Sequence, residues 1–131
     1  MKTYKLLRLR KDGTLGPLFI NRSLVMPIGK RLQAEVHPTK GYKERPGFHS
    51  TPQINAPHLT MKGRVWVECD VVGQQYTPEQ QPDMFSPKRD MDILPAWGWY
   101  YWERPEAQGG RWIISDNIKL IRIVEEEEVF A

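Results

Sequence analysis

Residues 65–72, VWVECDVV, give the clearest strand signal in this chain. Side chains alternate along an extended strand, so one face receives Val65, Val67, Cys69 and Val71. The stretch ahead of this strand, residues 41–64, holds two of the three histidines and several prolines. Proline fixes φ and removes an N–H donor, so we expect a shaped loop that leads into a rigid strand. Such a loop is where the sequence predicts a functional site.

The same period of two recurs along most of the chain. Strands are predicted over residues 4–10, 15–20, 24–28, 32–36, 65–72, 97–102, 111–114 and 118–124. Asp12-Gly13 supplies the positive φ of a tight turn between the first two of these segments. Gly16-Pro17 interrupts the second segment, which is therefore expected at the edge of a sheet.

Helix signals are few. Residues 51–59 are the best candidate, because Thr51 is a suitable cap and Pro52 suits a first turn, but Pro57 limits the helix to a turn or two. Residues 74–92 are polar and contain prolines, which predicts a long surface loop. The sequence thus predicts an α+β, mainly β fold: a single twisted, mostly antiparallel sheet or a split β-sandwich, with one short helix and long proline-rich loops.

The composition fits one globular domain, which we place at residues 1–124, followed by an acidic C-terminal tail at 125–131. The glutamate run at 125–128 is expected to be solvated and frayed. One cysteine excludes an internal disulfide framework, and there is no run of eighteen apolar residues. We therefore expect a cytoplasmic protein with no membrane partner.

The net charge of +3 conceals an asymmetry along the chain. Residues 1–50 contain eleven Lys/Arg and three Asp/Glu, whereas residues 51–131 contain eight and thirteen. The two halves either form separate basic and acidic faces or interleave and neutralise each other, and both arrangements stay open. If the basic half binds nucleic acid, the candidate residues are Arg8, Arg10 and Lys11.

Residues 97–102, WGWYYW, form the densest aromatic run. On a strand, Trp99 shares one face with Tyr101, and Tyr100 shares the other with Trp102. Either this strand is central and covered on both sides, or one aromatic set is a stacking platform for bases or an anchor for a protein partner.

The chain contains ligand types that zinc prefers, namely His37, His49, His58 and Cys69. No two of them are closely spaced, as structural zinc sites usually require, so we predict no metal site and no cofactor. Cys69 lies on the inward face of its strand, which favours a small buried apolar residue over a nucleophile.

Six segments, taken in order, match one known pattern. They are Arg45-Pro46-Gly47-Phe48-His49, Ala56-Pro57-His58 and residues 65–70, 98–101, 110–114 and 118–122. Through them the chain resembles, from Tyr4 to Val124, an uncharacterised small domain of bacteriophages and mobile elements that also occurs within very large multi-domain phage proteins. Phe48 stands where tryptophan is commoner in that pattern. The resemblance implies a phage or mobile-element origin more than it implies any particular chemical reaction.

The resemblance implies an accessory protein that binds a host macromolecule, such as an inhibitor of a bacterial defence system in the cytoplasm of an infected or element-carrying cell. The expected partner is a host bacterial protein or ribonucleoprotein complex. Glu103, Glu106 and residues 125–128 are acidic groups that can mimic phosphates towards such a partner. The candidate binding residues are Arg45, Phe48, His49, His58, Tyr100 and Trp102.

Two alternatives stay open. A glycine-aromatic-histidine segment ahead of a strand gives a fainter similarity to the ADP-ribosyltransferase core, which binds NAD. That similarity implies as catalytic candidates Arg8, Tyr42, His49 and Glu103, although the late strand at 111–114 lacks the expected carboxylate. The second alternative is a small nucleic-acid-binding protein that uses its basic N-terminal half.

Overall fold

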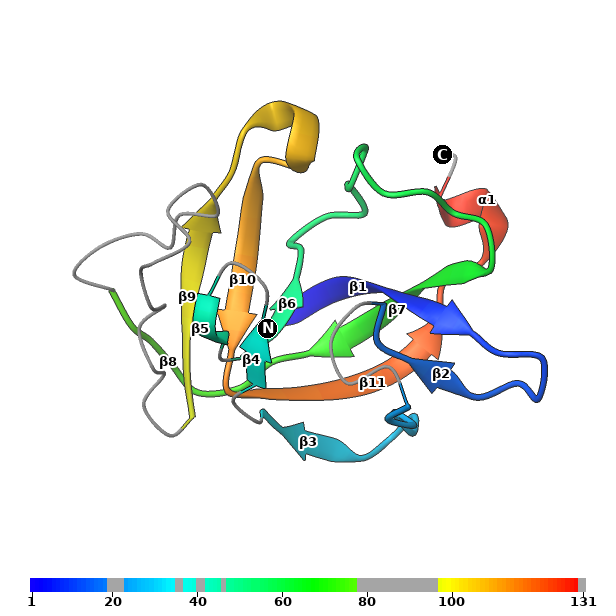
Figure 1. Cartoon of the computed structure of the whole chain (residues 1–131), viewed down its shortest axis with the longest axis horizontal. Helices are drawn as coiled ribbons and strands as arrows, with labels where there is room; N and C mark the ends of the chain where they lie inside the picture. Colours follow the sequence, from blue (N-terminus) through cyan, green and yellow to red (C-terminus); the bar gives the residue numbers. More distant parts are fainter. Residues whose placement is uncertain (19–22, 35–36, 40–41, 46, 78–96, 130–131) are drawn as a thin grey trace.

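The computed structural model describes residues 1–18, 23–34, 37–39, 42–45, 47–77 and 97–129. This part of the chain is mostly strand, and the fold is α+β, mainly β, with one short helix, as predicted (Figure 1). The strands are β1 (Lys2–Leu9), β2 (Leu15–Gly16), β3 (Arg31–Gln33), β4 (His37–Thr39), β5 (Tyr42–Arg45), β6 (Phe48–Ser50), β7 (Arg64–Asp70), β8 (Gln74–Gln75), β9 (Gly98–Glu103), β10 (Arg111–Ser115) and β11 (Asn117–Ile123). The helical elements are the 3₁₀ turn Glu106–Gln108 and helix α1 (Glu126–Val129). Within the described residues, no helix has the length and apolar character needed to cross a membrane.

The strands form two main sheets rather than a single one. A five-stranded sheet has the order β2-β1-β7-β11-β3, and a four-stranded sheet has the order β6-β10-β9-β8 (Figure 1). β4 and β5 pair with each other. The paired strands are antiparallel except β8 and β9, which are parallel.

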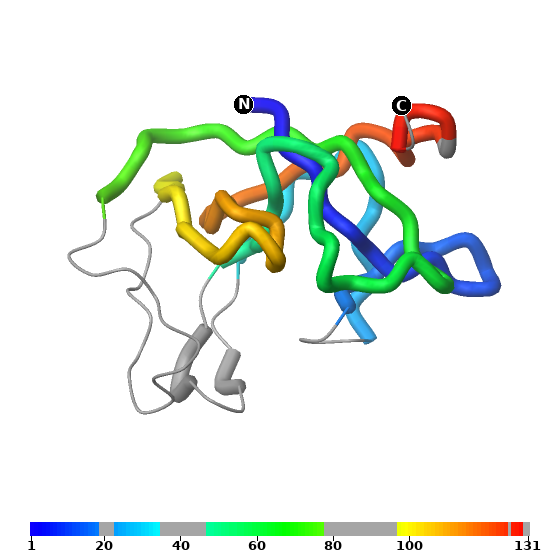
Figure 2. Tube along the Cα trace, turned by 90° about the horizontal axis from the view of Figure 1, so that it is seen from above, coloured from blue at the N-terminus to red at the C-terminus, as the bar shows by residue number. Residues whose placement is uncertain are grey.

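Two stretches of chain pass from one sheet to the other at a shared corner. Only Asp116 separates β10 from β11, and residues 71–73 join β7 to β8. A second link lies at β1, where the Tyr4 and Thr51 main chains exchange hydrogen bonds of 2.8 and 2.7 Å. Residues after β6 accordingly run alongside β1 (Figure 2). The sheets are therefore held together both at the corner and along β1.

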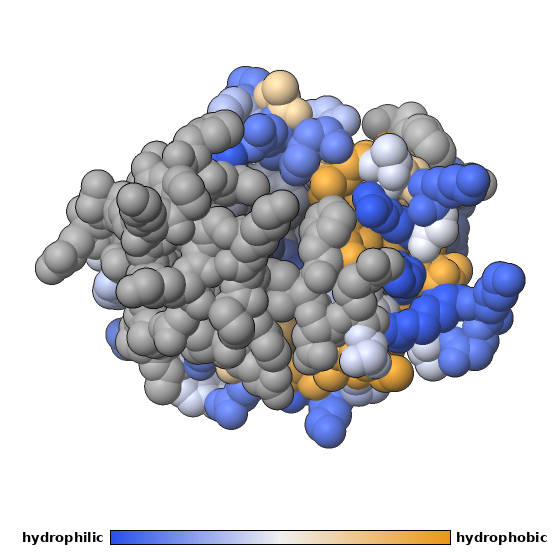
Figure 3. All heavy atoms as spheres, in the orientation of Figure 1, coloured by the Kyte–Doolittle hydropathy of each residue, from blue (hydrophilic) through white to orange (hydrophobic). Residues whose placement is uncertain are grey.

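The main core lies on the face of the five-stranded sheet that was predicted to be apolar. It contains the buried side chains Leu7, Leu15, Met26, Val67, Cys69, Val71, Ile118 and Leu120. Phe48 and Trp99 of the four-stranded sheet pack against it. On the opposite face a smaller cluster of Leu6, Trp66 and Val124 is covered by residues after β6. Figure 3 shows apolar residues (orange) at the surface between hydrophilic ones (blue). Val25 and Ile28 are among the large apolar residues that are exposed.

Three predictions of local structure were wrong. Residues 51–59 form bends and turns instead of a helix, because Thr51 pairs with Tyr4 across the chain. Residues 24–28 form no strand; Met26 binds the Leu15 carbonyl through its N–H and inserts its side chain into the core. The acidic tail was expected to be frayed, but its residues 126–129 form helix α1, and Val129 packs on the Leu6 cluster. β2 lies at a sheet edge, as predicted. Most of the predicted loop at 74–92 lies outside the described residues.

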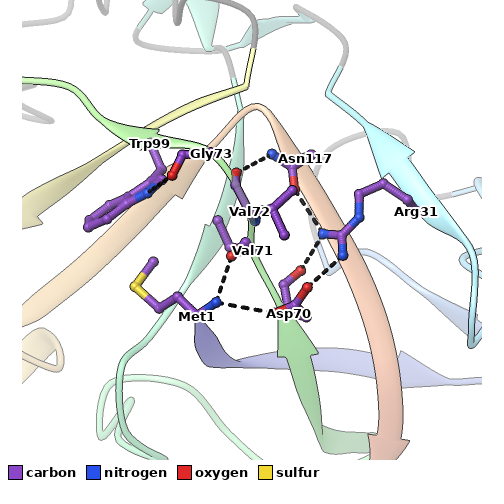
Figure 4. Close-up of polar contacts among 8 residues, drawn as sticks. All are labelled: Met1, Arg31, Asp70, Val71, Val72, Gly73, Trp99 and Asn117. Carbon is purple, nitrogen blue, oxygen red and sulfur yellow. Dashed lines mark hydrogen bonds and ion pairs between the residues drawn. The ribbon is translucent and has the colours of Figure 1, made fainter.

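The corner between the sheets is built around Asn117, whose side chain is fully buried (Figure 4). Its amide donates to the Val72 carbonyl (2.8 Å) and accepts from the Val72 N–H (3.1 Å), as a neighbouring strand would. Arg31 donates to the same amide oxygen (2.9 Å) and to the Asp70 carboxylate (2.6 Å). The amino group of Met1 also binds Asp70, at 3.1 Å. Polar groups on three strands therefore fix where the chain leaves the five-stranded sheet.

Asn117→Ala is expected to lower the free energy of unfolding by about 2–3 kcal/mol, because the Val72 N–H and carbonyl lose a fully buried partner. Urea unfolding followed by tryptophan fluorescence measures this. The matched control is Asn55→Ala, which removes an amide from an exposed position and should cost far less. Equal effects of the two substitutions would contradict the role given to Asn117.

Acid should destabilise the protein partly through Asp70. The hydrogen bond from Arg31, followed by that from the Met1 amino group, holds the pKa of Asp70 below its ordinary value. The resulting stabilisation is complete above the pKa of the unfolded chain, about 4, and is lost as the pH falls through the lowered folded-state pKa. In Asp70→Asn the melting temperature should therefore fall less steeply below about pH 4. Glu127→Gln, at an exposed position of α1, is the control that should keep the wild-type slope.

Candidate functional site

A polar cavity of about 280 Å³ lies where two irregular segments meet. One segment is the loop after β6, residues 51–59, here called the cavity loop. The other is the connection between β9 and β10, residues 104–110, here called the cavity turn. The cavity is lined by Thr51, Pro52, Gln53 and Asn55 of the loop, by Glu106, Gly109 and Gly110 of the turn, and by Arg111 at the start of β10. Both segments lie at the upper edge of the view in Figure 1.

The cavity loop is fixed at its start and along its inner side. Thr51 is buried, and its hydroxyl lies within hydrogen-bond distance of the carbonyls of Gln53 and Tyr4, in addition to its main-chain bonds with Tyr4. Ile54, Ala56 and Leu59 pack on the Leu6 cluster. The side chains of Gln53 and Asn55 are left exposed at the cavity. Anchors of this kind let an irregular segment present a constant surface.

The two glycine N–H groups of the cavity turn form hydrogen bonds within the turn itself. The Gly109 N–H donates to the Glu106 carbonyl and the Gly110 N–H to the Pro105 carbonyl, both at 3.1 Å. Gly109 has φ 95° and touches the cavity loop, since a Cβ there would lie 2.8 Å from the Asn55 carbonyl oxygen. Both facts require glycine at this position. Gly109 is thus the contact that keeps loop and turn together.

Aromatic and cationic side chains lie beside the cavity, on one face of the four-stranded sheet. His49 and Trp102 have ring centres 5.2 Å apart, and the Arg104 guanidinium lies 4.9 Å from the Trp102 ring. His58 meets Trp112 edge to face at 5.9 Å. Partial burial, and then the charge of Arg104, lower the pKa of His58, so this ring is neutral at pH 7.

The structure brings together three of the six predicted binding residues. His49, His58 and Trp102 belong to this layer next to the cavity. Tyr100 lies on the same face of the sheet but is fully buried, and Phe48 packs into the main core on the opposite face. The side chain of Arg45 lies outside the described residues. The loop ahead of β7 thus does border a cavity, although most cavity-lining residues were not among the predicted ones.

The catalytic set implied by the ADP-ribosyltransferase similarity is not assembled among its described members. His49 contacts Trp102, whereas Glu103 follows Trp102 on the strand and points to the other face, where Arg111 binds it at 2.7 Å. Arg8 lies in the five-stranded sheet opposite Arg64. The side chain of Tyr42 falls outside the described part of the chain.

The basic residues of the first half have mixed roles. Arg10 closes the β1–β2 hairpin by donating to the carbonyls of Leu15 (3.1 Å) and Leu24 (2.8 Å), while Lys11 is exposed at the turn. Lys2 approaches Glu68 at 3.7 Å, and the bond of Arg31 to Asp70 also joins the two halves. Among the described residues, these two ion pairs bring charges of the two halves together. Within the described part of the chain, no three His, Cys, Asp or Glu side chains are grouped to hold a metal ion.

Comparison with known proteins returned no match. No protein-family model fits this chain, and neither does any curated protein or solved structure.

Cys69 should be unreactive in the folded protein. It is 1% exposed, and burial raises its thiol pKa to about 12, so almost no thiolate forms at neutral pH. A chromogenic disulfide reagent at neutral to mildly alkaline pH should label the native protein only at the rate of unfolding. In concentrated guanidinium it should label one thiol per chain at once. Rapid labelling of the native protein would contradict the buried position.

Proposed function

We propose that this protein is an accessory factor of a bacteriophage or mobile element that binds a host macromolecule and thereby inhibits a bacterial defence system. The origin rests on the resemblance carried by the Arg45–His49 segment and the strands that follow. The binding role is supported by the cavity, whose lining comes from two anchored irregular segments. Enzymatic NAD chemistry is less well supported, since His49 and Glu103 lie on opposite faces of one sheet.

The charges at the cavity favour a cationic surface on the partner. The Glu106 side chain is exposed, and its carboxylate accepts no hydrogen bond or ion pair from the described residues. Glu103 is bound by Arg111, and Glu128 of α1 is bound twice by Arg122 at 2.8 Å. Among these acidic groups Glu106 is thus the one whose charge remains available to a partner. A carboxylate at a surface can occupy the place of a nucleic-acid phosphate on a basic partner.

The test combines a functional assay with a binding assay. The protein is expressed in bacteria that carry single defence systems, and plaques of a phage sensitive to each system are counted. Wild-type protein should restore plating against one system and co-purify with a component of it at fixed stoichiometry. Glu106→Lys reverses the charge at the cavity and should weaken both effects at least about tenfold. Glu127→Lys makes the same change on α1 and should leave both unchanged. Absence of plating recovery and of a stoichiometric partner in every strain would refute the proposal.

A further inference from the structure

We infer that the cavity between the cavity loop and the cavity turn is a receptor for a guanidinium group, that is, for one arginine side chain of a protein partner. This inference rests on the proposed binding function and specifies its chemistry. It follows from three properties of the lining: which donors are already used, which acceptors remain, and how much space there is.

The N–H donors of the two glycines in the cavity turn are already used within the fold. Gly109 and Gly110 donate to carbonyls inside the turn, and the indole N–H of Trp112, beside Gly109, donates to the Gln108 carbonyl at 2.7 Å. Arg111 donates through Nε to Glu103, and its guanidinium lies 4.5 Å from the Tyr101 ring. An anion in this cavity would have the Nη groups of Arg111 as donors but neither glycine N–H, and it would lie near Glu106. The two glycines therefore do not form a main-chain site for phosphate or carboxylate ligands.

Acceptors remain available on both sides of the cavity. The Glu106 carboxylate has no partner among the described residues, and one of its oxygens lies 3.8 Å from the point where a Cβ on Gly110 would stand. On the loop side, Asn55 uses only its amide nitrogen, in a long 3.5 Å contact with the Gly109 carbonyl. Its amide oxygen and the exposed amide of Gln53 are left to a ligand. The unpaired Glu106 carboxylate, together with these neutral acceptors, favours a cation that carries several donors.

The size and shape of the cavity favour arginine over larger or rounder cations. At about 280 Å³ the cavity is at or below the lower limit for drug-sized ligands, but it has room for the end of one side chain. A guanidinium is planar and presents five N–H groups in a fixed arrangement, whereas an ammonium concentrates three donors at one point. The acceptors here come from two segments that face each other, which suits a flat group lying between them. Arginine is also a residue that binds phosphates in nucleic-acid-binding proteins, so the inference fits a partner of that kind.

The inference is tested with small probes and ¹⁵N-labelled protein. N-acetyl-arginine amide is titrated at low salt, and amide shifts are recorded in heteronuclear NMR spectra. Saturable shifts are expected at Gly109, Gly110 and the side-chain amides of Gln53 and Asn55. N-acetyl-citrulline amide, which has nearly the same shape without the charge, should bind at least about tenfold more weakly, as expected for loss of a charge-assisted hydrogen bond. N-acetyl-lysine amide should bind more weakly than the arginine probe.

Substitutions then test whether the arginine probe binds at the cavity. Glu106→Gln keeps the size of the side chain and should weaken arginine binding about tenfold, with an unchanged melting temperature because the position is exposed. Glu127→Gln is the matched control and should bind like wild type. Equal binding of arginine and citrulline, shifts located elsewhere, or undiminished binding by Glu106→Gln would overturn the inference. If the probe fails while plating recovery and partner capture persist, only the arginine receptor is wrong. If recovery and capture are absent, the proposed function itself is wrong.

Discussion

The reciprocal pair of hydrogen bonds between the Asn117 amide and the Val72 main chain is the constraint on which the fold depends. It lies at the point where the chain has left β7 on one side and is about to enter β11 on the other. The buried Asn117 side chain takes the place of a strand neighbour for the Val72 N–H and carbonyl. Arg31 holds the same amide and the adjacent Asp70, so β3 is tied to the corner as well. The angle between the two sheets is set by these contacts rather than by the apolar core alone.

The corner between the sheets fixes the position of the cavity turn, because the paired strands β9 and β10 connect the two. From Ser115 to Arg111, β10 is paired with β9 without interruption, a span of roughly 13 Å, and the cavity turn closes the far end of this pair. The cavity loop is positioned separately, by the pairing of Thr51 with Tyr4 in β1. One side of the cavity is thus carried by β9 and β10, and the other by a loop that starts at β6 of the same sheet and is tied to β1 of the five-stranded sheet. Gly109 is the point where the two meet, and only a residue without a Cβ lets them approach so closely.

The strands were predictable where local pattern and tertiary packing agree, as in β7, whose Val67, Cys69 and Val71 alternate into the core. Local signals failed where a distant partner decides the conformation. Thr51 and Pro52 favour the start of a helix, but the main chain of Thr51 is taken by Tyr4, 47 residues away. The cavity could not be predicted from the sequence for the same reason. Gln53 and Asn55 are ordinary loop residues, and no periodic pattern relates them to Glu106. The two consecutive glycines at 109–110 were the one local sign that this connection has special geometry.

Ion pairing between individual side chains matters more for recognition at the cavity than the net charge of the whole chain. The chain carries a net charge of +3, yet Lys2 and Arg31 of its first half are paired with carboxylates of its second half. Screening at physiological salt limits the reach of the remaining charges to about 8 Å, so a partner at the cavity senses mainly the groups that line it. There Arg111 is paired with Glu103, whereas the Glu106 carboxylate has no ion-pair partner among the described residues. An ion pair formed on folding thus offsets one cation at the cavity, so the charge that a partner would meet there differs from the net charge of the chain.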